Sequence, residues 1–154
     1  MNITVTGFSK KKISVLREAC EFFAHQLMDP RMVRNLQIDI ERTPRNDVQG
    51  ECIDEDGTRN PRWFTINLRD GSDDEDVLQT LAHEMVHVKQ HAKNELQSGV
   101  MVAARGGMKM TSRWKGEIWK PKAKEDHYWD APWEIEAYGR EVGLLQRWVK
   151  HKSL

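Results

Sequence analysis

A pentapeptide near the middle of the chain, His83-Glu84-Met85-Val86-His87, constrains the fold more than any other feature. It matches the pattern H-E-x-x-H, and two residues four apart in an α-helix lie on the same face. The two imidazoles can then bind one metal ion while the glutamate lies beside them. The motif therefore predicts a helix that carries part of a zinc site.

The residues around this motif have the pattern of a helix that buries one side. Apolar residues recur at steps of three and four, namely Leu78, Leu81, Ala82, Met85 and Val88. Ser72 followed by Glu75 indicates a capping box, with acidic residues in the first turn where the helix dipole is positive. We expect the helix to begin near Asp73 and to end at about Asn94, which places both histidines at its middle.

The rest of the chain predicts an α+β fold of the following order: an N-terminal helix, a small and mostly antiparallel sheet, the histidine helix, a region of loops and a hairpin, and a C-terminal helix. The expected outer helices are residues 9–28 and 132–150. The expected strands of the sheet are residues 3–5, 36–40, 48–52 and 63–68. Residues 97–130 are expected to form loops around a hairpin with arms at 108–112 and 117–119.

Length and composition narrow the possible partners. The 154 residues have the size of one domain, 1–154. Lys and Arg total 24 and Asp and Glu total 24, so nucleic acid is not an expected partner. No apolar run is long enough to cross a bilayer, and the N-terminus does not resemble a signal peptide, so we expect a cytoplasmic protein without membrane contact. Cys20 and Cys52 form no CxxC pair, which argues against a thiolate zinc site.

A catalytic zinc ion needs a third protein ligand and leaves its fourth position to water. The candidates are His91, His127, Glu134 and Glu136. On the wheel of the expected C-terminal helix, Glu134 falls on the apolar side and Glu136 on the polar side. A buried carboxylate is costly unless it is paired or binds metal, which favours Glu134. His127 precedes that helix and stays an alternative, whereas His91 is predicted to lie at the surface.

Several further residues are candidates for supporting roles. Glu141 shares the apolar side with Glu134 and could accept a hydrogen bond from a ligand histidine. Tyr128, Tyr138 and His127 are candidate donors to the oxyanion of a tetrahedral intermediate. The tryptophans of the C-terminal third either pack or line a substrate cleft.

Two short stretches resemble zincin metallopeptidases, and within them the gluzincins. These stretches are residues 81–88, LAHEMVHV, and residues 134–137, EIEA. The resemblance implies that the first glutamate of the second stretch, Glu134, binds the metal.

In layout the chain is also similar, over roughly residues 10–150, to small intracellular or phage-encoded SprT-like domains. Two departures stand out: Tyr138 occupies a position where many gluzincins have aspartate, and SprT-like proteins tend to use a third histidine, for which His127 is the candidate. The metzincin pattern of a glycine and a third histidine after the motif is absent.

These observations together predict a zinc-dependent peptidase that acts on a peptide or protein substrate. Zn²⁺ would be held by His83, His87 and Glu134, and Glu84 would be the general base. The zincin layout implies that residues 63–68 form the sheet edge that pairs with the substrate. The alternatives are a non-catalytic module closed by a fourth zinc ligand, for which His127 is the candidate, and a DNA-associated SprT-like protease or regulator. The sequence does not determine the cleavage preference or the oligomeric state.

Overall fold

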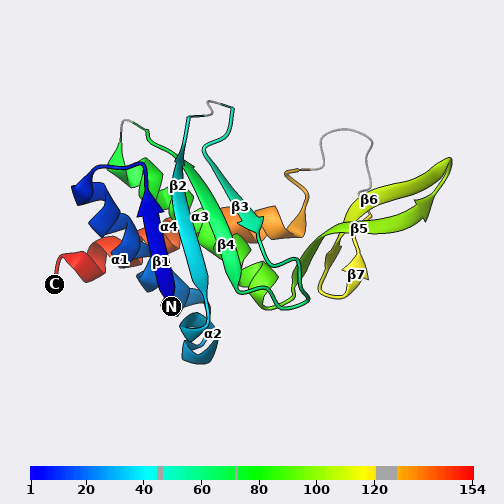
Figure 1. Cartoon of the computed structure of the whole chain (residues 1–154), viewed down its shortest axis with the longest axis horizontal. Coiled ribbons are helices and arrows are strands. Elements are labelled where there is room, and N and C mark those ends of the chain that lie inside the picture. Colours follow the sequence, from blue (N-terminus) through cyan, green and yellow to red (C-terminus); the bar gives the residue numbers. More distant parts are fainter. Residues whose placement is uncertain (45–46, 72, 121–127) are drawn as a thin grey trace.

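The computed structural model describes residues 1–44, 47–71, 73–120 and 128–154 and has an α+β fold (Figure 1). The helices are α1 (Lys10–Leu27), α2 (Pro30–Arg34), α3 (Asp74–Ala92) and α4 (Pro132–Lys152). The strands are β1 (Asn2–Thr6), β2 (Gln37–Thr43), β3 (Gly50–Asp54), β4 (Trp63–Arg69), β5 (Leu96–Ala104), β6 (Gly107–Trp114) and β7 (Glu117–Ile118). Among these residues, no helix is both long and apolar enough to span a bilayer.

The first four strands form one sheet in the order β1-β2-β4-β3. Strands β1, β2 and β4 are parallel, and β3 joins β4 in antiparallel orientation. The expectation of a mostly antiparallel sheet was wrong here, because α1 provides the long crossover that parallel neighbours β1 and β2 need. Residues 63–68 were also wrongly placed at the edge. Strand β4 buries Phe64, Thr65, Ile66 and Leu68, as an inner strand does, and β3 forms the edge beside it.

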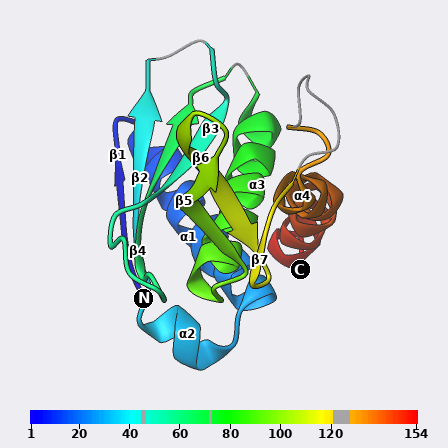
Figure 2. The same ribbon diagram turned by 90° about the vertical axis from the view of Figure 1, so that its right-hand side faces the viewer.

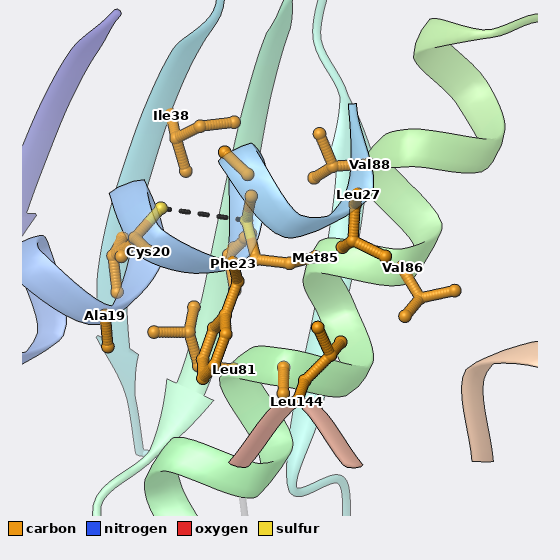
Figure 3. Packing of buried hydrophobic residues seen from close by; sticks show 14 of the residues in the cluster. Ala19, Cys20, Phe23, Leu27, Ile38, Leu81, Met85, Val86, Val88 and Leu144 are labelled. Atoms are coloured by element: carbon orange, nitrogen blue, oxygen red, sulfur yellow. Dashed lines mark hydrogen bonds between the residues drawn. The ribbon is translucent and has the colours of Figure 1, made fainter. Parts of the chain in front are cut away.

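The core lies between this sheet and the helices α1 and α3 (Figure 3). Helix α1 begins after Ser9, whose side chain accepts a hydrogen bond from the amide of Lys12. Its buried stripe includes Cys20 and Phe23, and the Cys20 sulfur lies 3.6 Å from the sulfur of Met85 on α3. Helix α4 packs on α3 at the side away from the sheet (Figure 2). Helix α3 is therefore covered on several sides.

Helix α3 agrees closely with the expected histidine helix. Its N-cap is Asp73, whose side chain accepts a hydrogen bond from the amide of Glu75. The expected cap, Ser72, lies outside the described residues. From Leu81 to Ala92 every residue of α3 is buried, so the motif is enclosed on all sides except where a cleft reaches it. Burial at this level orders the backbone that presents the two histidines.

Strands β5, β6 and β7 form a second, antiparallel sheet that projects from the body of the molecule (Figure 1). The two expected hairpin arms are confirmed as β6 and β7. Strand β5 was not anticipated, because its first half is polar and contains Gly99. The structure accommodates this stretch as an irregularity in the register between Gln97 and Val100.

Candidate metal centre

Three side chains from α3 and α4 converge below the surface. His83 Nε2 and His87 Nε2 lie 3.2 Å apart, and each lies 3.2 Å from one oxygen of Glu134. The exposed fractions of the three residues are 7%, 8% and 8%. One atom from each residue lies within 4.8 Å of the others, which is close enough for one metal ion to contact all three. The two imidazoles and the carboxylate are also the donor set of a well-known class of catalytic zinc site.

The fold separates the two acidic candidates on α4 as the helical wheel predicted. Glu134 lies in the first turn of α4, on the face that packs against α3, and it is buried. Glu136 points elsewhere and accepts hydrogen bonds from Lys89 and Gln90, at 2.8 and 2.9 Å. Glu136 therefore pairs with a buried lysine and does not join the histidines. The other alternative, His127, lies outside the described residues.

Each histidine is oriented by a second partner on its other ring nitrogen. His83 Nδ1 lies 2.7 Å from Glu141 Oε2, in the position expected for Glu141. His87 Nδ1 lies 2.8 Å from Gln90 Oε1, and Gln90 also donates a hydrogen bond to the carbonyl oxygen of Trp133. Both rings therefore present Nε2 to the common point, and such partners fix the tautomer of a ligand histidine. Gln90 was not anticipated, although its spacing of three residues from His87 places it on the same helix face.

Replacing Glu141 by glutamine is expected to weaken zinc binding by about 10- to 100-fold. The Glu141 carboxylate accepts hydrogen bonds from Gln79 at Oε1 and from His83 at Oε2, and in glutamine one of these two positions becomes an NH₂ group, which cannot accept. Titration of the metal-free protein with zinc against a competing chelator measures the change. Asp76→Asn is the matched control, because Asp76 lines the same cleft and loses the same charge without contacting either histidine. Equal zinc affinities for the two variants would contradict the orienting role.

The electrostatic environment distinguishes the two buried glutamates. Burial raises the pKa of Glu84 to about 7, and no described residue donates a hydrogen bond to its carboxylate. Burial also raises the pKa of Glu134, but hydrogen bonds from His83 and His87 outweigh it and the pKa falls to about 2. Glu134 is therefore held as a carboxylate, which a ligand must be, whereas Glu84 takes up a proton much more readily.

A cleft of about 690 Å³ opens onto these residues. Its walls come from β3, α3, the start of β5 and the start of α4, and it reaches His83, Glu84, His87 and Glu134. Trp133 lines it, in agreement with one of the two interpretations of the tryptophans, while Trp114 and Trp119 pack against Trp133. The site is therefore buried but accessible along one side.

Gly50, on the edge strand β3, is a functional candidate that the sequence analysis missed. A Cβ atom at this position would lie 2.9 Å from Glu84 Oε1 and 2.5 Å from Thr80 Cγ2. A glycine inside a strand often marks such a close approach, but the sequence does not say which neighbour approaches. Only the packing of α3 against β3 identifies the neighbours as the Thr80 methyl group and the Glu84 carboxylate.

Gly50→Ala is expected to displace the Glu84 carboxylate and to lower the rate of peptide hydrolysis by about 100-fold, since shifts of about 1 Å can have effects of that size. Zinc affinity should not change, because the three candidate ligands do not touch Gly50. Steady-state kinetics and zinc titration measure the two effects. Gly139→Ala on α4 is the control, since an added Cβ there meets nothing within 4 Å. Full activity of the Gly50 variant would show that Glu84 has room to move.

The remaining candidates lie at the border of the cleft. The Tyr138 ring lies 4.5 Å from the His83 ring, and the Tyr128 and Tyr138 hydroxyls are 3.0 Å apart. Both tyrosines line the cleft, so either hydroxyl can be reached by a bound molecule. His91 was expected at the surface, which was wrong. It is 9% exposed and packs near Phe64 of β4, and burial lowers its pKa.

Comparisons of this chain with protein-family models, with curated proteins and with solved structures give no match. The resemblance to zincins thus rests on the two short motifs alone. The activity of the chain has to be inferred from the geometry of the site.

Proposed function

We propose that this chain is a zinc-dependent peptidase. The observation that carries the proposal is the convergence of His83 Nε2, His87 Nε2 and the Glu134 carboxylate in a cleft that also reaches the Glu84 carboxylate. Three protein donors are the number that catalytic zinc sites use, whereas structural sites use four. When bound, zinc would polarise the scissile carbonyl and lower the pKa of a water molecule.

The protein's own residues supply the remaining chemistry. Glu84 is buried and has no hydrogen-bond donor among the described residues, so its carboxylate is free to take a proton from water and pass it to the leaving amine. The hydroxyls of Tyr128 and Tyr138, which line the cleft and lie 3.0 Å apart, would donate a hydrogen bond to the oxyanion. Glu141 and Gln90 keep the two imidazoles in one orientation throughout.

The edge of the sheet suggests how a peptide would bind. Strand β3 lines the cleft and pairs with β4 along one side only. An extended peptide could add to its outer side as a further strand, through main-chain hydrogen bonds. Strand β3, and not residues 63–68 as expected from the sequence, would therefore pair with the substrate.

The test combines metal content with activity. Protein purified without added chelator should contain about one zinc ion per chain, and it should cleave an unfolded protein substrate. Removal of the metal by a chelator should stop cleavage, and added zinc should restore it. A chain that binds no zinc would refute the proposal. A zinc ion with four protein ligands in X-ray absorption spectra, together with no cleavage, would favour the non-catalytic module instead.

A further inference from the structure

The β5–β6 hairpin carries an exposed row of methionines on one face. Met101 pairs directly with Met110, and Met108 lies two residues along β6 on the same face. Their exposed fractions are 51%, 67% and 63%. We call these three residues the methionine face. Exposed large apolar side chains gathered on a projecting element mark a contact surface more often than scattered ones do.

The methionine face lies on the same side of the hairpin as residues that reach the cleft. Residues alternate between the two faces along β6, so Trp114 lies on the same face as Met108 and Met110. The Trp114 ring lies 6.3 Å from the ring of Trp133, which lines the cleft. At the base of the hairpin, Leu96 pairs with Trp114 and also lines the cleft. The row of residues from Met108 to Trp114, which includes Ser112, therefore leads from the outer part of the hairpin toward the cleft.

The charge of the hairpin differs from that of the whole chain. Residues 96–116 contain no acidic residue, and the basic ones are Arg105, Lys109, Arg113 and Lys115. Lys109 pairs with Val102 and Arg113 with Gln97, so both lie on the face opposite the methionines. The methionine face itself is uncharged, and two basic residues flank it along the chain, Arg105 in the turn between β5 and β6 and Lys115 directly after Trp114.

We propose that the methionine face binds the part of a polypeptide substrate that lies outside the cleft, as an extended segment of apolar residues mixed with acidic ones. This inference rests on the proposed peptidase function. Methionine side chains are flexible and adapt to many apolar partners, which suits a surface that meets varied unfolded sequences. A nucleic acid would be expected on the opposite, basic face, so the uncharged methionine face favours a polypeptide.

The test uses β-casein, an acidic protein without stable tertiary structure, as the probe. Binding of fluorescein-labelled β-casein to zinc-loaded Glu84→Gln protein is measured by fluorescence anisotropy. Changing Met101, Met108 and Met110 to serine should weaken binding about tenfold, or about 1.4 kcal/mol. Changing the same three residues to leucine should retain binding. In the protein with Glu84 intact, the serine changes should raise KM for β-casein and leave the hydrolysis of a short peptide unchanged.

The matched control is Val100→Ser with Val102→Ser, on the opposite face of β5. It should leave β-casein binding unchanged. Equal β-casein affinities of the methionine-to-serine variant and its parent would overturn the inference. An equal loss of β-casein affinity in the methionine-to-leucine variant, or in the variant with Val100 and Val102 changed to serine, would also overturn it. Displacement of β-casein by a DNA duplex with steep salt dependence would overturn it in favour of nucleic acid. Failure of the peptidase proposal is recognised separately, because Met101, Met108 and Met110 do not line the cleft, so their replacement should change neither zinc content nor short-peptide hydrolysis.

Discussion

Replacing Glu84 by glutamine should lower the rate of peptide hydrolysis by about 10²- to 10⁴-fold while zinc remains bound, because a positioned general base typically contributes that much. Glutamine has nearly the same shape as glutamate but cannot take a proton from water. The candidate ligands His83, His87 and Glu134 are untouched, and the change removes a buried carboxylate that accepts no hydrogen bond from the described residues. Single-turnover hydrolysis and zinc content, measured on the same preparation, report the two quantities.

The control for this experiment is Glu75→Gln. Glu75 lies in the first turn of the same helix, is exposed and loses the same charge on substitution. It should retain full activity. Retained turnover in the Glu84 variant would remove Glu84 from the mechanism, whereas loss of both zinc and turnover would show that Glu84 supports the site structurally.

Replacing Glu134 by glutamine should weaken zinc binding by more than about 100-fold, since even partners outside the ligand set contribute 10- to 100-fold. The carboxylate contributes one oxygen toward each histidine, at 3.2 Å. A neutral amide is a poor zinc ligand, and the two histidines alone leave the ion largely hydrated. Competition with a chelator of known affinity measures the loss, and hydrolysis should fall with zinc occupancy.

Glu136→Gln provides the comparison within the same motif. Glu136 accepts a hydrogen bond from the buried Lys89, which also pairs with Glu95, so its replacement should lower the free energy of unfolding by only about 1 kcal/mol. Zinc affinity should stay as in the unaltered protein. If Glu136→Gln loses zinc and Glu134→Gln retains it, the assignment of ligand and structural partner on α4 is reversed.

The helical elements of the site could be predicted because periodicity along one helix is a local property. The spacing of apolar residues around the motif indicated which face of α3 would be buried. The same argument on the last helix separated Glu134 from Glu136 and placed Glu141 near a ligand histidine. The structure brings Glu134 and Glu141 to the histidines as this pattern required. The α+β class followed from the order of these periodic segments.

The features that the sequence did not disclose depend on which segments become neighbours. Gly50 and Glu84 are separated by more than thirty positions, and nothing local to either indicates that they meet. His91 is polar and lies near a helix end, but packing near β4 and the start of β5 buries it. The parallel arrangement of β1, β2 and β4 was missed for the same reason. The alternation of apolar and polar residues along a strand shows which face is buried, but it does not show which strand pairs with it or in which direction.

By itself, the sequence determined the two helices that contribute to the site, the buried side of α3 and the histidine pair on it, and it favoured Glu134 over Glu136 as their partner on α4. Only the tertiary structure decided which strand borders the cleft, which small residue leaves space for the Glu84 carboxylate, and where the methionine-bearing hairpin lies. The physical reason is that helical spacing repeats every 3.6 residues and can be recognised in a single segment. Contacts between segments depend on chain reversal and packing, which no single segment encodes.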